Sequence, residues 1–471
     1  MVQLVHESIT SNDLTPEIGA ADILMIRRSY KQSSSCRRKS AMKPLISLVQ
    51  YTGSPDSLKE AVKLCGGLEK LKRNARVLIK PNLITWDDQF KIAPFGVFTT
   101  TRLVEDLVVM LKDHGCREIS IGEGSVQIKE GIGTMAAFAG LGYTSLVKKY
   151  GVKLIDFNDG KSVNFKIRKG LTLHIAQEAM ECDFLINFPV LKTHAQTKVS
   201  LGLKNLKGCL KTSSKKICHH ASPGLEYCFT FVADSIKPAL TIVDGIYALE
   251  RGPLHFGNAF RKGIIIASRD ILGADMVAAK TIGYDPGDIV HFVEYAKRHG
   301  KSLDLKDYAI RGEALEDHIK PLKWDWGWTK DNTGPSIFEK FGVTGVALPK
   351  YDETLCSGCT PLANMVNILV LSAFTGQPLP KVEVLNGKKM QARPGYDKTV
   401  LIGNCIIKTN KENAHIRKAI KVTGCPPDTR DVIDALKEAE LHIDELAYWG
   451  YLKQQGEKYD NQEGYSRDFY E

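Results

Sequence analysis

The chain has 471 residues, which is long for one domain and natural for two or three. Apolar residues make up 43% and charged residues 25%, as in soluble globular proteins. A net charge of +10 over this length is weak support for nucleic-acid binding, and the sequence has neither a recognition-helix pattern nor alternating aromatics and arginines. We therefore expect no nucleic-acid partner.

The cysteines indicate a reducing compartment. Eleven is an odd number and does not suit a disulfide framework. We see no secretion signal and no apolar stretch of membrane-spanning length, so we expect a cytoplasmic protein without a membrane partner. Residues 1–42 include the basic run 36–39 and are expected to form a flexible extension.

An alternation of strands and helices begins near residue 45. Apolar strands interleaved with helices predict an α/β fold with a mostly parallel sheet that helices cover on both faces. We assign residues 43–300 to this first domain. The expected strands are 76–80, 118–121, 154–157, 183–187, 240–243 and 263–266, and the expected helices fall near 57–65, 102–114, 134–149, 271–282 and 289–299.

Polar residues follow four of these strands at their carboxyl ends. They are Lys80-Pro81-Asn82, Gly122-Glu123-Gly124-Ser125, the stretch from Asn187 to His194, and Asp244. Ligands of such sheets bind beyond the carboxyl ends of the strands. One polar strand end is no more than a polar loop, but four together indicate a shared site.

Residues 189–216 contain seven lysines and no acidic residue. Evenly spaced lysines usually form a solvated face, but this run follows a strand and is mixed with Leu, Val and Gly. Lysines at such a place bind a carboxylate or phosphate, or act as a base when their pKa is lowered. The run therefore predicts a small anionic substrate.

Cys209, Cys218 and Cys228 lack the close pair spacing of a zinc knuckle. With His219-His220 they could bind a second metal, but packing or surface thiols explain them better.

A second α/β pattern follows a linker at 301–335. The linker contains Trp324 to Trp328, which we interpret as an interdomain plug rather than a partner surface. The second domain spans 336–451, and the polar tail 452–471 is expected to be frayed. Its expected strands are 343–348, 381–385, 398–402 and 419–423, and its expected helices are 361–374 and 429–440.

Four cysteines fall at carboxyl ends of strands in this second pattern: Cys356, Cys359, Cys405 and Cys425. One sheet could bring them together, and four thiolates in one place form a metal or cluster site. One tight pair with two distant single ligands favours an iron–sulfur cluster over zinc, which uses two tight pairs. Zinc and unrelated buried thiols remain open.

The motifs around these cysteines resemble a known domain. C-S-G-C-T before an apolar helix, then G-x-C, then G-C-P-P, is similar to the proximal-cluster domain of nickel–iron hydrogenase small subunits, over about 340–445. G-C-P-P is also similar to the matching subunit of respiratory complex I. The resemblance implies a flavodoxin-like domain with one 4Fe-4S cluster on Cys356, Cys359, Cys405 and Cys425. No cysteine follows Cys425 and no nickel-binding pairs are present, so hydrogen chemistry is not implied.

A second resemblance covers about 75–285. I-K-P-N-L, G-E-G-S, N-F-P-V-L-K-T-H-A-Q-T-K-V-S-L-G-L-K-N-L-K-G and I-V-D-G-I resemble the domain of unknown function 362 family, many members of which carry iron–sulfur clusters. By these motifs the catalytic candidates are Glu123, Lys192 and His194, with Glu123 or His194 as general acid or base. The substrate-binding candidates are Lys80, Asn82, Lys204, Asn205 and Asp244. Alternatively, Asn82, Glu123 and Asp244 could hold a divalent metal, or these side chains could only fix the loops.

Three functions compete on this sequence. The first is an iron–sulfur oxidoreductase that passes electrons from a ferredoxin-like donor to a small anionic substrate. The second is a lyase, isomerase or hydratase with a structural cluster, and the third is an electron carrier or assembly factor. Neither a Walker A motif nor a dinucleotide fingerprint opens a helix, so we expect no P-loop or Rossmann cofactor. A homodimer remains open.

Overall fold

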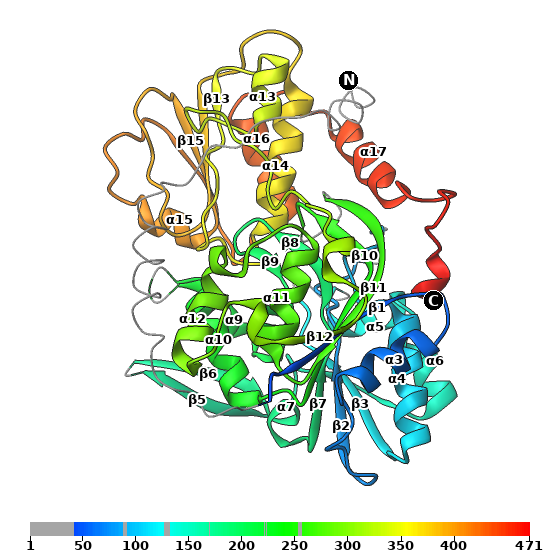
Figure 1. Ribbon diagram of the computed structural model, residues 1–471. Helices are drawn as coiled ribbons and strands as arrows, with labels where there is room; N and C mark the ends of the chain where they lie inside the picture. The colour runs from blue at the N-terminus through cyan, green and yellow to red at the C-terminus, as the bar shows by residue number, and fades with distance from the viewer. Residues whose placement is uncertain are drawn as a thin grey trace.

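The computed structural model describes residues 42–87, 92–126, 132–168, 170–220, 222, 224–252 and 257–471 (Figure 1). Apart from Met42, the expected extension lies outside the described residues. The fold is α/β, as predicted, with one sheet in each of two domains and a separate hairpin. Among the described residues, no helix is both long and apolar enough to cross a bilayer.

A mixed sheet forms the first domain, with strand order β12-β1-β11-β10-β7-β2-β3-β4. The run from β10 to β4 is parallel, and β11 pairs antiparallel with both β10 and β1. The strands are β1 (Leu45–Gln50), β2 (Arg76–Lys80), β3 (Glu118–Glu123), β4 (Lys153–Asp156), β7 (Phe184–Asn187), β8 (Val190–His194), β9 (Lys198–Ser200), β10 (Leu240–Glu250), β11 (Asn258–Ser268) and β12 (Ala309–Gly312). β8 branches off β10 and pairs with β9, and β12, which falls in the expected linker, pairs with β1.

Helices cover both faces of this sheet because its central strands are apolar on both sides. Along β2, Val77 and Ile79 enter one core cluster and Leu78 enters the other. The first cluster includes α3 (Asp56–Leu64), α4 (Thr101–His114), α5 (Thr134–Gly140) and α6 (Tyr143–Tyr150). The second includes α7 (Gln177–Glu181), α8 (Gly202–Asn205), α9 (Thr212–Cys218), α10 (Leu225–Ile236), α11 (Ile271–Thr281), α12 (Val290–His299) and the hairpin of β5 (Ser162–Arg168) and β6 (Leu171–Ala176).

One expected helix is divided. The sequence predicts a single helix near 134–149, but α5 ends at Gly140 and α6 begins at Tyr143. Gly142 lies between them with a φ of 72°, in the left-handed region that interrupts a helix. The hairpin, β1, β8, β9 and α10 have no counterpart among the expected elements.

The second domain is a four-stranded parallel sheet in the order β13-β14-β15-β16 (upper left in Figure 1). This order matches a flavodoxin-like sheet from its first strand onward, but the strand that would lie outside β13 is absent from the described residues. The strands are β13 (Val346–Ala347), β14 (Val382–Leu385), β15 (Lys398–Ile402) and β16 (Ala419–Val422); the helices are α13 (Ser336–Phe341), α14 (Thr360–Ala373), α15 (Asn404–Thr409), α16 (Thr429–Glu438) and α17 (Glu445–Gly456).

The end of the chain is not frayed, contrary to the sequence expectation. After α17 the chain returns to the first domain, and Tyr470 is only 2% exposed. The Phe95 ring is the centre of an aromatic cluster, with ring centroids 5.6 Å from Tyr459, 5.1 Å from Tyr465 and 5.8 Å from Tyr470. The tail composition is polar, but its aromatic residues complete a core that lies far away in the sequence.

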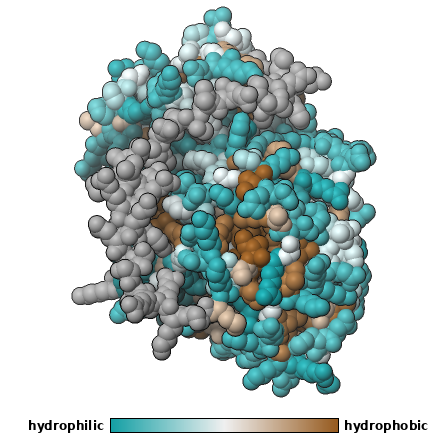
Figure 2. Space-filling model, in the orientation of Figure 1, coloured by the Kyte–Doolittle hydropathy of each residue, from teal (hydrophilic) through white to brown (hydrophobic). Residues whose placement is uncertain are grey.

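The tryptophan segment contacts both domains. The Arg251 guanidinium lies 4.2 Å from the centroid of the Trp326 ring, and Trp328 Nε1 donates to Leu348 O at 2.9 Å. In the view of Figure 2, hydrophilic residues cover much of the described surface, and apolar residues gather in one area over the first domain.

Candidate functional site

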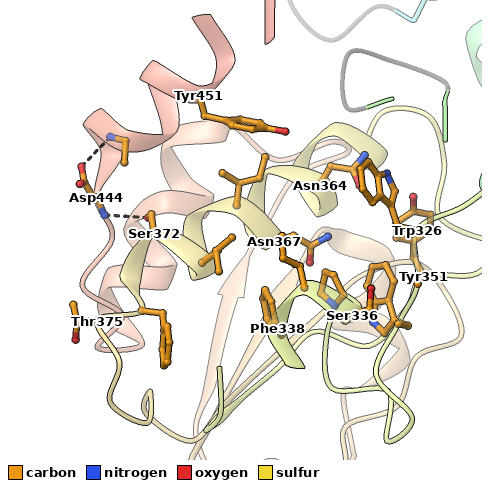
Figure 3. A pocket seen from close by; sticks show the side chains of 18 residues that line it. Trp326, Ser336, Phe338, Tyr351, Asn364, Asn367, Ser372, Thr375, Asp444 and Tyr451 are labelled. Carbon is orange, nitrogen blue, oxygen red and sulfur yellow. Dashed lines mark hydrogen bonds between the residues drawn. The ribbon is translucent and has the colours of Figure 1, made fainter. Parts of the chain in front are cut away.

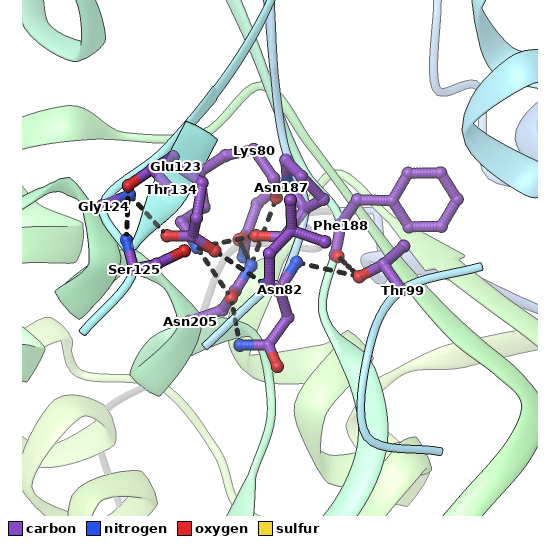
Figure 4. Close-up of polar contacts among 12 residues, drawn as sticks. Lys80, Asn82, Thr99, Glu123, Gly124, Ser125, Thr134, Asn187, Phe188 and Asn205 are labelled. Carbon is purple, nitrogen blue, oxygen red and sulfur yellow. Dashed lines mark hydrogen bonds and ion pairs between the residues drawn. The ribbon is translucent and has the colours of Figure 1, made fainter. Parts of the chain in front are cut away.

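A buried ion pair joins the ends of two neighbouring parallel strands. Lys80 ends β2 and Glu123 ends β3, and Lys80 Nζ lies 2.8 Å from Glu123 Oε2 with both side chains at most 3% exposed (Figure 4). Lys80 uses its other two donors on Pro81 O at 2.6 Å and Asn205 Oδ1 at 3.0 Å. Glu123 also accepts from the Leu83 and Gly124 amides at 2.9 and 2.8 Å. Both buried charges are therefore fully bonded.

Carboxamides extend this network across the sheet. Asn82 Nδ2 donates to Asn205 Oδ1 at 2.9 Å, and Asn205 Nδ2 donates to Asn187 Oδ1 at 2.9 Å. Lys192 Nζ donates to Asn82 Oδ1 at 2.5 Å and to Val97 O at 2.7 Å. Burial, and next the Lys204 charge, lower the pKa of Lys192 well below its usual value. The network holds five polar side chains of the predicted site in fixed positions.

Two glycines allow the backbone to approach this ion pair. A Cβ at Gly208 would lie 2.3 Å from Glu123 Oε1 and 2.6 Å from Lys80 Nζ. A Cβ at Gly124 would lie 2.5 Å from both Gly208 O and Lys215 Nζ. The glycines of G-E-G-S and L-K-G are thus required by contact distances.

A cavity of about 130 Å³ opens over the network, and we name it the lysine pocket. Four lysines line it, against a single acid, Glu123. Its lining includes Lys80, Asn82, Glu123, His194, Gln196, Lys204, Asn205, Lys207 and Lys215 of the first domain, and Ser357, Thr360 and Pro361 of the second. The pocket is small, rich in positive charge, and formed by both domains.

Lys204 differs from the other lysines of the pocket. It is half-buried and makes no hydrogen bond or ion pair with another described residue. Burial, and then the charge of Lys207, lower its pKa to about 7. Burial also lowers the pKa of Lys215 to about 7, but that ammonium donates to Gly124 O and Asn158 Oδ1 at 2.6 and 2.9 Å. Lys204 is therefore the cation available to a ligand.

His194 lines the pocket as a neutral imidazole. Its Nδ1 accepts from the Gln196 amide at 3.1 Å, which places the ring proton on Nε2. Burial and the nearby charges of Lys204 and Lys192 lower the His194 pKa well below its usual value. This imidazole can donate a hydrogen bond from Nε2–H to a ligand without carrying a charge.

Asp244 does not line the lysine pocket. Its carboxylate accepts from the Thr100 amide at 2.7 Å and the Ile246 amide at 3.0 Å, and burial raises its pKa to about 6. The other seven candidates of the first domain line the pocket or, in the case of Lys192, contact a lining residue. Asp244 fixes the start of α4, whose N-cap residue is Thr100.

The divalent-metal alternative has no geometric support. Glu123 is occupied by Lys80, Asn82 Oδ1 by Lys192, and Asp244 by main-chain amides. Across the part of the chain that the structure describes, no group of three or more His, Cys, Asp or Glu residues is arranged to hold a metal ion.

Residues that the sequence reasoning did not select connect the two domains. Gln196 Nε2 donates to Asp352 O at 2.8 Å and Leu355 O at 2.9 Å, just before Cys356. His219 Nδ1 donates to Glu353 O at 2.8 Å, and its Nε2 accepts from Lys207 at 2.8 Å. Gln196 and Lys207 belong to the lysine-rich run 189–216. The sequence of this run therefore included the contacting residues, but it did not show that they contact the second domain.

The four late cysteines lie at the edge of the second sheet that faces the lysine pocket. Cys359 precedes α14, Cys405 is in α15 after β15, and Cys425 follows β16. Mutual hydrogen bonds between Asn404 and Gly424 (2.9 and 3.0 Å) hold the last two loops together.

The four thiols are close enough to affect one another. A hydrogen bond with Cys359 lowers the pKa of Cys356 to about 5. The pKa of Cys359 is raised by the same bond, by burial, and by the thiols of Cys356, Cys425 and Cys405. Lys216, the last residue of the lysine-rich run 189–216, places its Nζ 3.5 Å from Cys425 Sγ.

The three cysteines that follow the long motif, Cys209, Cys218 and Cys228, are fully buried. Cys209, Cys218 and Cys228 have 0% exposure, and Cys218 and Cys228 hydrogen-bond to each other. His219 bonds to Lys207 and to Glu353 O, so three of the residues suggested for a second metal site (Cys218, Cys228 and His219) have other partners.

Residues 77–280 match the family described as "Domain of unknown function (DUF362)". The match confirms the second sequence resemblance over these residues, which include every candidate site residue of the first domain. It ends before the late cysteines, so the hydrogenase-like resemblance stays a prediction.

Two known proteins are similar to parts of the chain. "Thylakoid-associated protein sll1697" from Synechocystis sp. (strain ATCC 27184 / PCC 6803 / Kazusa) is 28% identical over 244 residues, which are 50% of this chain and 71% of that protein. The lactate racemase apoprotein from Thermoanaerobacterium thermosaccharolyticum matches 50% of this chain with 14% identity and a TM-score of 0.33. This chain spans 57% of that structure, and a likeness at this level carries no argument.

Proposed function

We propose that the protein is an iron–sulfur oxidoreductase that passes electrons to a small anionic substrate in the lysine pocket. The proposal rests on one observation: both domains contribute residues to the wall of the lysine pocket. Lys204 and His194 come from the first domain, whereas Ser357, Thr360 and Pro361 come from the C-S-G-C-T loop and the start of α14. A substrate that contacts the lysines would therefore lie beside the cysteine loop.

The cysteine set fits a 4Fe-4S cluster. Cys356, Cys359, Cys405 and Cys425 would be its ligands, and such a cluster, when bound, exchanges single electrons with a partner. The Lys216 ammonium and the amino end of α14 would offset the negative charge of the thiolates. Among the described residues no group of three or more His, Cys, Asp or Glu residues is arranged to hold a metal ion, so the cluster assignment rests on the motif resemblance and on the placement of the four cysteines at one sheet edge. A ferredoxin-like protein in the cytoplasm would supply the electrons.

The pocket chemistry defines the substrate class. The Lys204 ammonium has no partner among the described residues and would bind a carboxylate or phosphate oxygen. The small volume of the pocket favours a ligand of few heavy atoms. His194 would donate a hydrogen bond from Nε2–H to an oxygen that gains electron density during reduction. The Lys80–Glu123 pair would hold the loops in place.

A second candidate, a lyase, isomerase or hydratase, is favoured by one observation. Lys204, with a pKa near 7, and neutral His194 line the same pocket, which is the pairing that acid–base chemistry uses. The cluster would then be structural. A pure electron carrier or assembly factor would not need a pocket of this kind, so we place it third.

The first test is anaerobic purification with iron and sulfide analysis, followed by EPR before and after dithionite. We expect about four irons and four sulfides per chain and a signal in the reduced state. Cys356→Ser should lose most of the iron, whereas Cys182→Ser, a partly buried cysteine of the first domain, should retain it. Zinc without sulfide would overturn the proposal.

A substrate screen separates the two enzymatic candidates. Small carboxylates and phosphate esters are mixed with the dithionite-reduced protein after excess reductant is removed. Loss of the EPR signal of the reduced cluster, together with formation of a reduced product, supports the oxidoreductase. A substrate that is converted while the EPR signal is unchanged supports the lyase or isomerase.

A further inference from the structure

A larger cavity lies within the second domain, on the flank of α14 (Figure 3). Its volume is about 490 Å³, within the range of small-molecule sites. Residues of α13, α14, α17 and the tryptophan segment enclose it. Neither the family match nor the candidate site residues extend to it.

Aromatic rings form one wall of this cavity. The wall includes Trp326, Trp328, Phe338, Tyr351 and Tyr451. Trp328 and Tyr351 pack edge to face with centroids 6.4 Å apart, and Trp328 is fixed by its bond to Leu348 O. The wall is thus held in position before a ligand arrives, and flat rings pack well on such surfaces.

Two carboxamides face this wall from α14. Asn364 and Asn367 are three residues apart, so they lie on one side of the helix and line the cavity together. Neither side chain hydrogen-bonds to another described residue. Two further polar side chains of the lining are already used: Ser372 Oγ donates to Leu369 O at 2.7 Å, and Asp444 Oδ1 accepts from the Ala447 amide at 2.9 Å.

The charge of the lining defines the ligand further. Among the described residues that line the cavity there is no Lys, Arg or His, and the one acid, Asp444, caps α17. A phosphate or carboxylate would find no counter-ion there. Carboxamide N–H groups suit carbonyl acceptors, and the aromatic wall suits a flat apolar ring.

We propose that this cavity, here named the aromatic cavity, binds a neutral planar aromatic compound with carbonyl groups at its edge. The ring packs against Trp328 and Phe338, and the carboxamides of Asn364 and Asn367 donate to the carbonyl oxygens. This inference does not rest on the proposed function, because it uses neither the lysine pocket nor the cysteines.

The test compares two probes of one shape by isothermal titration calorimetry on the full chain. 2,3-Dimethyl-1,4-naphthoquinone carries two carbonyls and has no free position for thiol addition, and 2,3-dimethylnaphthalene is the same skeleton without carbonyls. We expect saturable one-to-one binding of the quinone, about 3- to 10-fold tighter than the hydrocarbon for each hydrogen bond made. Naphthalene-2-sulfonate, an anion, should not bind.

Variants assign the binding to the carboxamides. Asn367→Leu and Asn364→Leu, each checked for an unchanged melting temperature, should each weaken quinone binding about 3- to 10-fold, because each removes one of the two hydrogen bonds. The double variant should bring the affinity for the quinone close to that of the hydrocarbon. Asn164→Leu, on the exposed face of β5, is the matched control and should change nothing. No saturable binding of the quinone, or equal affinities in wild type and in both α14 variants, would overturn the proposal. If one variant fails to fold, the other still decides the outcome.

Discussion

The lysine pocket and the aromatic cavity are built in opposite ways. In the lysine pocket the charged groups Lys80 and Glu123 are paired with each other, and among the described lining lysines Lys204 is the one whose ammonium has no partner in the described part of the chain. In the aromatic cavity the lining lacks positive charge, and two neutral carboxamides remain available. On our two proposals, the lysine pocket would select its ligand by charge and the aromatic cavity by shape and hydrogen bonding.

The two cavities also differ in how they could be found. The lysine pocket takes eight of its 18 lining residues from the continuous run 189–216, whereas the aromatic cavity takes its walls from five segments between residues 326 and 451. A site encoded by neighbouring residues is visible in the sequence, but a site assembled by packing is not. The following experiments test how far this difference in construction extends.

The largest expected effect is the loss of unfolding free energy when the buried Lys80–Glu123 ion pair is broken. Glu123→Gln leaves the Lys80 ammonium without a counter-charge at 1% exposure, so we expect the free energy of unfolding to fall by about 3–5 kcal/mol. Urea unfolding measures the loss. The double variant Lys80→Met/Glu123→Leu should lose less, because it leaves no buried charge behind.

The matched control is an exposed pair. Asp56 and Lys59 lie 3.5 Å apart on α3 with side chains 82% and 52% exposed, so Asp56→Asn should change stability by less than about 0.5 kcal/mol. A loss below about 1 kcal/mol for Glu123→Gln would mean that water reaches Lys80, and the lysine pocket would then be open rather than pre-organised.

The sequence predicted the sheet and the strand ends with good accuracy. β2 and β15 have the expected bounds, and Lys80 and Glu123 meet because neighbouring parallel strands end at one edge. Strongly apolar strands are readable because their burial on both faces leaves a continuous pattern. Asp244 was selected by the same rule, yet its carboxylate binds main-chain amides, a partner that no sequence pattern specifies.

The misses share a physical reason. The tail 457–471 is polar in composition, and its aromatic residues find their partner, Phe95, more than 350 residues away. Gln196 lies inside the lysine run 189–216, but its partners, Asp352 O and Leu355 O, lie just before Cys356 in the other domain. Lys207 of the same run contacts that domain through His219, which donates to Glu353 O. Local patterns carry no information about contacts of this range.

The second expected effect concerns the available charge of the lysine pocket. The pKa of Lys204 is lowered to about 7, so its ammonium dominates below that pH and is lost above it. With oxalate as the probe, we expect affinity to fall about tenfold from pH 6 to pH 8, and binding at pH 8 to take up a proton. Calorimetry in buffers of different ionisation enthalpy measures both.

Substitution separates Lys204 from its neighbours. Lys204→Gln should weaken oxalate binding about tenfold or more at pH 6 and reduce the pH dependence, leaving the part that comes from Lys215. Lys59→Gln, an exposed lysine on α3, should have no effect on binding. An unchanged oxalate affinity in Lys204→Gln would mean that the anion binds elsewhere. The lysine pocket would then not be the site that selects ligands by charge.

The smallest expected effect is on the contact that joins the lysine pocket to the cysteine loop. Gln196 Nε2 donates to Asp352 O and Leu355 O, and Gln196→Leu removes both bonds while it keeps the packing volume. We expect a loss of about 1–2 kcal/mol in unfolding free energy and oxalate affinity a few-fold weaker, because the second-domain wall of the pocket is less fixed. Binding of 2,3-dimethyl-1,4-naphthoquinone should not change, since none of its proposed contacts passes through Gln196. If Gln196→Leu weakens both ligands equally, the two cavities respond to one interdomain movement, and the separation between a charge-selecting and a shape-selecting site would not hold in solution.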